Sequence, residues 1–99
     1  PICLLVYNEF TPNNDGSNDV FRIDCIENYP NNKLEVYNRY GDLVYETRGY
    51  QNDWDGTANK GAIFTNKPLP VGTYYYVLKV DGRGEVEDVN IQGWLYIMR

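Results

Sequence analysis

The longest strand-like segment of the chain reads Thr73-Tyr74-Tyr75-Tyr76-Val77-Leu78-Lys79-Val80-Asp81. Its β-branched and aromatic residues favour an extended backbone, in which successive side chains point to opposite faces. One face carries Tyr74, Tyr76, Leu78 and Val80, and the other carries Tyr75, Val77 and Lys79. The first face is entirely hydrophobic by residue type. This pattern predicts a strand with one side buried in a core and the other side wetter.

Six further segments have strand character and are separated by turn formers. They are residues 2–7, 20–26, 33–39, 43–48, 85–90 and 94–98. The second of these segments alternates as well, with Phe21, Ile23 and Cys25 on one face and Arg22 and Asp24 on the other. Tight turns at residues 39–42 and 81–84 would close antiparallel hairpins, since Asp-Gly favours a turn with positive φ.

Seven short strands without a substantial helical pattern predict an all-β fold, an Ig-like antiparallel β-sandwich. A chain of 99 residues has room for one core, so residues 1–99 are expected to form a single domain. Residues 51–70 are the longest segment without strand character, and loops of that length tend to carry function.

Composition excludes several classes of function. The net charge of −5 and the pI near 4.5 argue against nucleic acid as a partner. The longest apolar run, residues 2–7, is far shorter than the roughly 18 residues needed to span a membrane. There is no histidine, no phosphate-binding glycine loop and no nucleophile motif, and carboxylates two or four residues apart in a loop define no cleft, so we expect no catalysis.

The run Asn8-Glu9-Phe10-Thr11-Pro12-Asn13-Asn14-Asp15-Gly16-Ser17-Asn18-Asp19 predicts an ordered loop and neither strand nor helix. Proline fixes φ, glycine permits positive φ, and Asn, Asp and Ser bond to nearby backbone. Oxygen-bearing side chains alternate at Asn13, Asp15, Ser17 and Asp19. They could bind calcium, although the glycine and glutamate of an EF-hand are missing. The alternative is a turn held by its own side-chain hydrogen bonds.

Two further motifs have both a binding and a packing interpretation. In Asp53-Trp54-Asp55-Gly56, an exposed indole could stack on a sugar, whereas a buried one would plug the end of the sandwich, and Gly56 suits a turn. In Asn38-Arg39-Tyr40-Gly41, the forked guanidinium of Arg39 could pair with a carboxylate of the first loop and fix it against the sheet.

Cys3 and Cys25 are the two cysteines of the chain. In an exported protein they could form a disulfide, and otherwise each would be a small buried hydrophobic residue. Neither is expected to be catalytic, because no histidine is present to activate a thiol.

Several separated motifs follow one another in a characteristic order. After the first loop come Tyr29-Pro30-Asn31-Asn32, Leu34-Glu35-Val36-Tyr37-Asn38-Arg39-Tyr40-Gly41, Val44-Tyr45-Glu46, Trp54-Asp55-Gly56, Leu69-Pro70-Val71-Gly72-Thr73-Tyr74-Tyr75-Tyr76 and Gly93-Trp94-Leu95-Tyr96-Ile97-Met98-Arg99. This set resembles the gliding motility-associated C-terminal domain, the type B sorting domain of Bacteroidetes proteins exported by the type IX secretion system. One departure is Asn14, where the family loop usually has a glycine.

The resemblance implies a secretion signal at the C-terminal end of a larger exported protein, of which this chain would be a fragment. Such signals are read at the outer membrane with a cognate PorP/SprF-type protein and pass from the periplasm through the type IX translocon to the cell surface or medium. Gliding adhesins are among the cargo. No cofactor is implied, apart from the calcium considered above.

The resemblance also assigns residues. The loop-scaffold signature would comprise Pro12, Asn13, Asp15, Gly16, Asn18, Asp19, Arg39, Gly41, Trp54, Asp55 and Gly56. The last segment ends in a strand whose edge could pair with a partner strand. It contributes the candidate recognition residues Gly93, Trp94, Tyr96, Ile97 and Arg99, some of which could instead fill the core. Two other functions stay open: a carbohydrate-binding module that uses Trp54 and Tyr50, and an Ig-like spacer in an adhesin.

Overall fold

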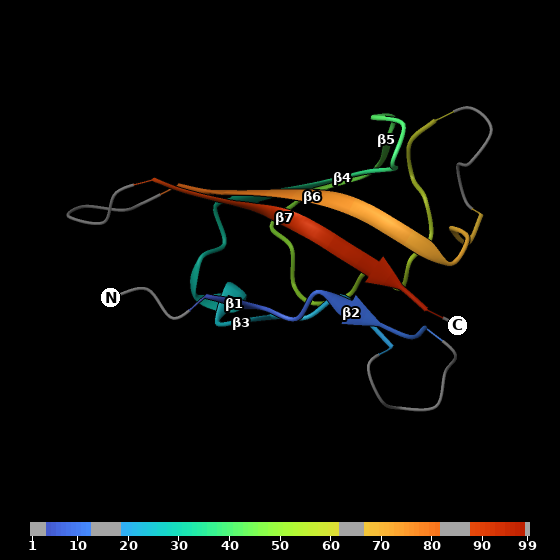
Figure 1. The fold of residues 1–99 in the computed structure, drawn as a ribbon. Helices are drawn as coiled ribbons and strands as arrows, with labels where there is room; N and C mark the ends of the chain where they lie inside the picture. Colours follow the sequence, from blue (N-terminus) through green and yellow to red (C-terminus); the bar gives the residue numbers. More distant parts are fainter. Residues whose placement is uncertain (1–3, 13–18, 62–66, 82–87, 99) are drawn as a thin grey trace.

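The computed structural model describes residues 4–12, 19–61, 67–81 and 88–98. Within them lie β1 (Leu5–Val6), β2 (Glu9–Phe10), β3 (Ile23–Asp24), the 3-10 turn η1 (Ile26–Asn28), β4 (Asn32–Tyr37), β5 (Leu43–Arg48), β6 (Gly72–Val80) and β7 (Val89–Ile97). The strands form a two-stranded sheet, β1-β3, and a five-stranded sheet of order β2-β7-β6-β4-β5. Figure 1 shows the large sheet above the layer that contains β1 and β3. The predicted all-β sandwich of seven strands is confirmed.

The large sheet is built around the tyrosine-rich strand β6. β6 pairs along its whole length with β7, from Gly72 opposite Ile97 to Val80 opposite Val89. Its other edge pairs with β4, which in turn pairs with β5, and all these pairs are antiparallel. The two faces of β6 are as predicted. Tyr74, Tyr76, Leu78 and Val80 are buried on one face, and the residues of the other face are less buried.

The predicted turn between β4 and β5 is present. Gly41 has φ 86°, and its N–H donates to the carbonyl oxygen of Asn38 at 3.0 Å. The second predicted turn, at residues 81–84, falls mostly outside the described residues.

One prediction was wrong at Gly93, where the sequence analysis placed a break between two strands. β7 instead runs without interruption through Gly93, which lies directly opposite Tyr76. A Cβ atom at this position would come within 3.3 Å of the Tyr76 hydroxyl oxygen. The glycine therefore leaves room for the Tyr76 ring and does not end the strand.

The first loop was also predicted too long, because Glu9–Phe10 forms β2. This short strand pairs with the end of β7, and the pair is parallel, unlike the rest of the sheet. The N–H of Tyr96 donates to Asn8 O at 2.8 Å, and that of Met98 donates to Phe10 O at 3.0 Å. Burial of the Phe10 side chain and this long-range pairing outweigh the local turn signals.

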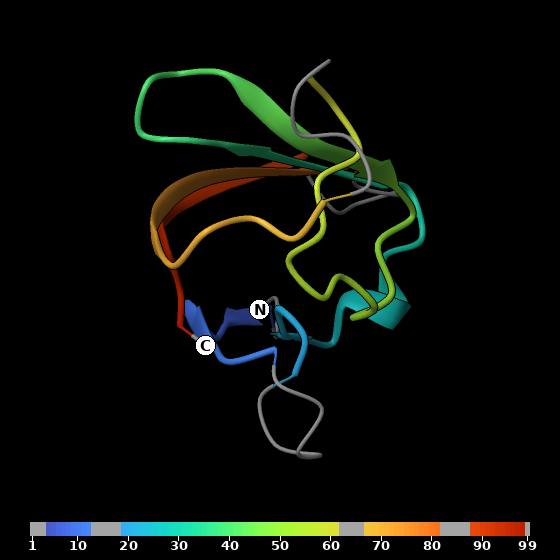
Figure 2. The same ribbon diagram turned by 90° about the vertical axis from the view of Figure 1, so that its right-hand side faces the viewer.

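The predicted strand over residues 20–26 is shortened to β3. Cys25 has a left-handed backbone with φ 67°, so the strand ends there and η1 follows. The outer edge of β3 is met by residues that come after β5, as Figure 2 shows for the yellow-green segment that approaches the lower layer. There Asn52 bonds to Ile23, and Trp54 O accepts a hydrogen bond from Phe21 N at 3.0 Å.

The strand order is Ig-like. In Ig domains strands C, F and G share one sheet, C′ can extend it, and A and B lie in the other. Here β7-β6-β4-β5 follows the order G-F-C-C′, and β1-β3 follows A-B. Where an Ig domain has its D and E strands, the described residues between β5 and β6 contain a single isolated bridge, Thr57 to Pro68.

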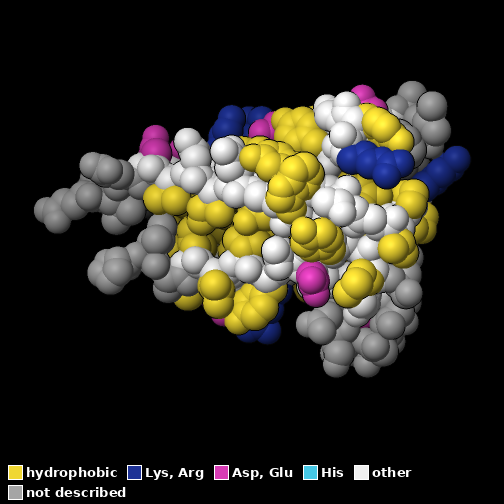
Figure 3. Space-filling model, in the orientation of Figure 1, with side chains coloured by type: hydrophobic (Ala, Val, Ile, Leu, Met, Phe, Trp, Pro, Cys, Tyr) yellow, Lys and Arg dark blue, Asp and Glu magenta, His cyan; other side chains and the backbone are white. Residues whose placement is uncertain are grey.

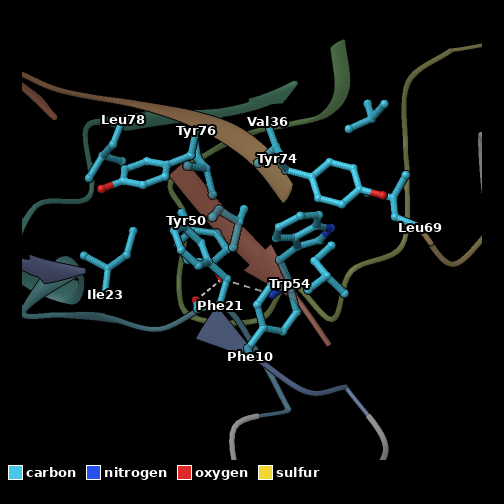
Figure 4. Packing of buried hydrophobic residues seen from close by; sticks show 14 of the residues in the cluster. Phe10, Phe21, Ile23, Val36, Tyr50, Trp54, Leu69, Tyr74, Tyr76 and Leu78 are labelled. Carbon is cyan, nitrogen blue, oxygen red and sulfur yellow. Dashed lines mark hydrogen bonds between the residues drawn. The ribbon is translucent and has the colours of Figure 1, made fainter. Parts of the chain in front are cut away.

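The core between the sheets is rich in aromatic rings. Phe21 contacts the rings of Tyr76 at 5.4 Å and of Tyr50, Phe10 and Trp54 at 6.2 Å, between ring centroids. Figure 4 shows these rings converging from both layers. The Tyr50 hydroxyl donates to Phe21 O and accepts from Trp54 N at 3.3 Å. Burial raises the Tyr50 pKa, which keeps this phenol protonated and able to donate.

Candidate recognition surface

The candidate recognition residues of β7 divide between two faces. Trp94 and Tyr96 point outward, with 54% and 37% of their surface exposed. Ile97 is fully buried, and Gly93 lies against the Tyr76 ring. Arg99 lies outside the described residues. Of the four described, the outward pair is therefore accessible to a protein partner.

An aromatic row crosses the outer face of the large sheet, on the side away from β1 and β3. In the strand register Tyr37 lies opposite Tyr75, and Tyr75 lies opposite Trp94. The Tyr75 and Trp94 rings meet edge to face, with centroids 5.3 Å apart and planes at 76°. This edge-to-face arrangement is one that aromatic pairs favour. We call Tyr37, Tyr75, Trp94 and Tyr96 together the aromatic face.

Sequence reasoning missed two tyrosines of this surface, Tyr37 and Tyr75. Only the strand register shows that Tyr75 lies between Tyr37 and Trp94. The alternation along β6 did place Tyr75 on the outward side. Figure 3 shows hydrophobic side chains gathered over β6 and β7, with charged side chains beside them.

The same side of the sheet becomes charged beyond Tyr37. The Tyr37 hydroxyl donates to Glu35 Oε2 at 3.2 Å, and Lys33 Nζ lies 3.8 Å from Glu35 and 3.9 Å from Glu46. Desolvation, followed by the charge of Glu35, raises the pKa of Tyr37. Partly exposed ion pairs of this kind add little stability, but they give the aromatic face a polar border.

Trp54 has a structural position. Its side chain is 2% exposed, stacks on Tyr45 with centroids 4.7 Å apart, and donates from Nε1 to Thr57 O at 2.9 Å. Asp55 accepts a hydrogen bond from Thr57 N at 3.2 Å, and Gly56 has φ 88°. The indole packs in the core, so it has no face to offer a sugar.

The expectation that Tyr50 is exposed was wrong, because this residue is only 1% exposed. Its main-chain N–H donates to Asn32 Oδ1 at 2.8 Å, and its hydroxyl is held within the core as described above. The carbohydrate-binding alternative relied on Trp54 and Tyr50 as platforms, and neither is accessible.

Arg39 lies in the turn between β4 and β5. Its guanidinium carbon is 5.0 Å from the centroid of the Tyr40 ring, and its Nη2 donates to the Tyr40 hydroxyl at 2.8 Å. A cavity of about 290 Å³ separates this turn from residues 69–74. The predicted pairing of Arg39 with a carboxylate of the first loop stays a prediction, because half of that loop, including Asp15, lies outside the described residues.

The calcium hypothesis also falls largely outside the described residues, which exclude Asn13, Asp15, Gly16, Ser17 and Asn18. Only Pro12 and Asp19, at the borders of this gap, are described. Among the residues that the structure places, no three His, Cys, Asp or Glu side chains group as a metal site would require. Calcium binding by the first loop stays a prediction.

Cys25 is disulfide-bonded. Its predicted partner, Cys3, lies outside the described residues, so the pairing itself stays a prediction. Cys25 follows β3 in a left-handed conformation, and a covalent bond there would anchor the small sheet.

The fold and its surface define a class: a small Ig-like module with an exposed aromatic face on its large sheet and with no assembled catalytic group in the parts described. Over residues 4–97 the chain matches the family model of the CHU_C type IX secretion signal domain. The chain belongs to this family, and the resemblance seen in the sequence is confirmed. No curated protein and no solved structure matches it.

Membership gives the domain its general role. It is a sorting signal that interacts with the type IX secretion machinery and directs export to the cell surface or the extracellular space. This family is a class of signals and not of enzymes. Within the described residues, no helix has the length and apolar character that a membrane crossing requires.

Proposed function

We propose that this domain is recognised in its folded state, through the aromatic face, as the C-terminal export signal of a larger surface protein such as a gliding adhesin. The reader would be a cognate PorP/SprF-type protein, which meets the domain at the outer membrane after its passage through the periplasm. The observation that carries the proposal is the ordered, outward-facing aromatic row on the large sheet.

Energetic reasoning supports a binding role for this face. Trp94 is more than half exposed at 54%, so most of its apolar surface contributes nothing to folding. Tryptophan and tyrosine are the residues that most often dominate protein interfaces. Because Trp94 already packs on Tyr75, binding would cost less side-chain entropy than for a tryptophan without such a contact.

Charge would act at an earlier stage of recognition. The net charge of −5 favours approach to a basic surface and raises the association rate more than the final affinity. The aromatic face, with its polar border, would then provide the specific contact.

A reporter fusion tests the proposal. Residues 1–99 are attached to the C-terminal end of a fluorescent protein carrying an inner-membrane export signal, in a host with the type IX system. We expect the double substitution Trp94→Ala and Tyr96→Ala to lower reporter export at least tenfold. Deletion of residues 94–99 would be a poorer test, because Leu95 and Ile97 are fully buried and their loss would unfold the domain.

The matched control is Tyr40→Ala, which removes an aromatic ring that is 74% exposed on the turn between β4 and β5. This variant should be exported like the parent fusion. Each variant is also checked by thermal unfolding. Normal export of a folded Trp94→Ala, Tyr96→Ala variant would show that the aromatic face is not the recognition surface.

A further inference from the structure

Among the residues that the structure describes, nothing pairs with the outer edge of β7 over more than half of its length. Tyr96 N and Met98 N both donate to β2 and not to β6. In an antiparallel pair the residues alternate between bonding toward the partner and bonding away from it. The β6-β7 register has no shift, so the N–H and C=O groups of Asn90, Gln92 and Trp94 also face away from β6.

The described part of the large sheet offers no neighbour on that side of these three residues. β2 covers only the end of β7, with Glu9 opposite Tyr96 and Phe10 opposite Ile97. An uncovered strand edge is a template for another strand, and soluble proteins usually block it with a bulge, a proline, a lysine or a covering loop.

Two other strand edges in this domain are blocked by asparagine side chains. At β3, Ile23 N donates to Asn52 Oδ1 at 2.7 Å, and Asn52 Nδ2 donates to Ile23 O at 3.2 Å. At β5, Glu46 N donates to Asn59 Oδ1 at 2.9 Å, and Asn59 Nδ2 donates to Glu46 O at 2.8 Å. Each amide side chain thus replaces one residue of a neighbouring strand. No side chain of the described ranges covers the first part of β7 in this way.

Partly buried apolar side chains lie beside the uncovered edge. The hydrophobic side chains of Leu4, Val6, Val89 and Ile91 are only partly buried and pack against the core. They belong to β7 and to the chain around β1, the strands that border this side of the two layers. In Figure 3 hydrophobic side chains are visible between these two strands.

We propose that a short extended strand of the export machinery adds to the open edge of β7, at Asn90, Gln92 and Trp94. This inference rests on the proposed function and specifies its partner. The added strand would exchange main-chain hydrogen bonds with β7, as in other cases of β-strand addition. Its inward side chains would pack on Val6 and Ile91 and its outward ones beside Trp94, so it should carry apolar residues at alternate positions.

A second copy of the domain fits this edge less well. Each copy carries a net charge of −5, which opposes association. In a second copy, β2 would already be paired with β7 at Tyr96. An antiparallel pairing of the two β7 strands could then include only the few residues between the two β2 strands. A single strand from another protein meets neither obstacle.

A proline substitution tests the edge directly. Gln92→Pro removes an N–H that faces away from β6, so the β6-β7 pairing should persist, as it does for prolines on strand edges. In the reporter fusion we expect at least tenfold less export for Gln92→Pro than for the parent. The control Gln92→Ala removes the same side chain but keeps the N–H, and it should be exported normally. Thermal unfolding establishes that both variants are folded.

The outcomes separate this inference from the proposed function. No export of the parent fusion would contradict the function itself. Normal export of folded Gln92→Pro would overturn the strand addition and leave the function intact. A discrete dimer of the isolated domain that Gln92→Pro abolishes would also overturn it, because the edge would then belong to a second copy.

If Gln92→Pro does not fold, hydrogen exchange of the unsubstituted domain tests the proposed strand addition at β7. In the free domain the amides of Asn90, Gln92 and Trp94 should exchange faster than those of Ile91, Gly93 and Leu95. Addition of the purified cognate PorP/SprF-type protein should slow the first three at least tenfold. Unchanged exchange at these three amides in a formed complex would contradict the proposal.

Discussion

The Tyr74 hydroxyl donates a hydrogen bond to the main-chain oxygen of Pro70 at 2.7 Å. This contact ties the start of β6 to the segment that leads into it, four residues upstream. It has the arrangement of the tyrosine corner that marks strand F in Ig domains. β6 is a central strand of the sheet, since it pairs with two other strands along its length. The Tyr74 hydrogen bond fixes where this strand begins.

Removal of this hydroxyl should therefore cost measurable stability. We expect Tyr74→Phe to lower the free energy of unfolding by about 0.5–1.5 kcal/mol, the usual net value of one hydrogen bond. Tyr75→Phe is the matched control, since Tyr75 is the next residue and its ring lies on the outer face; a change within about 0.5 kcal/mol is expected. Urea denaturation measures both, and equal effects would contradict a special role for the Tyr74 hydroxyl.

Sequence reasoning succeeded where local periodicity and the final environment agree. The predicted and observed bounds of β5 coincide, and those of β4 and β6 agree within two residues. It failed at Gly93 and at β2, where the outcome depends on a ring from the neighbouring strand and on pairing with the other end of the chain. Trp94 was selected from its position in a motif, but the tyrosines beside it could be found only from the register.

Asn52 shows the same dependence on tertiary context. It bonds both main-chain groups of Ile23 and has a left-handed backbone, with φ 61°. Asn52→Gly keeps that conformation and removes the two hydrogen bonds, so we expect a loss of about 1–3 kcal/mol. Asn52→Ala should cost roughly 1–2 kcal/mol more, because alanine is strained in the left-handed region.

Chemical denaturation of the two Asn52 variants separates bonding from strain. The control is Asn90→Ala, which removes only an exposed side chain and should be nearly neutral. If glycine at position 52 were as stable as asparagine, the side chain would not be replacing a strand.

Truncation of the two tryptophans should lower stability by very different amounts. Trp54 is buried among Phe10, Phe21 and Tyr45, so Trp54→Ala should lower the free energy of unfolding by about 3–5 kcal/mol. That is a large part of the roughly 5–15 kcal/mol that stabilises a small domain. Trp94→Ala, on the outer face, should cost less, about 1–2 kcal/mol, because 54% of this residue is exposed and the rest packs on Tyr75. Denaturant unfolding compares them, and a similar loss for both would mean that Trp94 also supports the core.

The carboxylate of Asp24 makes stability depend on pH. Arg22 Nε and the Tyr7 hydroxyl each donate to it at 2.9 Å, and these hydrogen bonds, Arg22 first, lower the pKa of Asp24 below its ordinary value. The unfolded chain therefore binds the proton more readily than the folded one. The resulting stabilisation is fully present above the unfolded pKa near 4 and disappears as the pH falls through the folded pKa.

Substitution should reveal this contribution in thermal melts between pH 2 and pH 6. Asp24→Asn should melt below the parent at pH 6, and the difference should shrink toward pH 2, where the parent carboxylate is protonated. In an NMR titration, Arg22→Gln should raise the Asp24 pKa more than Tyr7→Phe does, because the guanidinium makes the larger contribution. A difference in melting temperature that stays constant from pH 2 to pH 6 would mean that Asp24 acts through its shape and not through its charge.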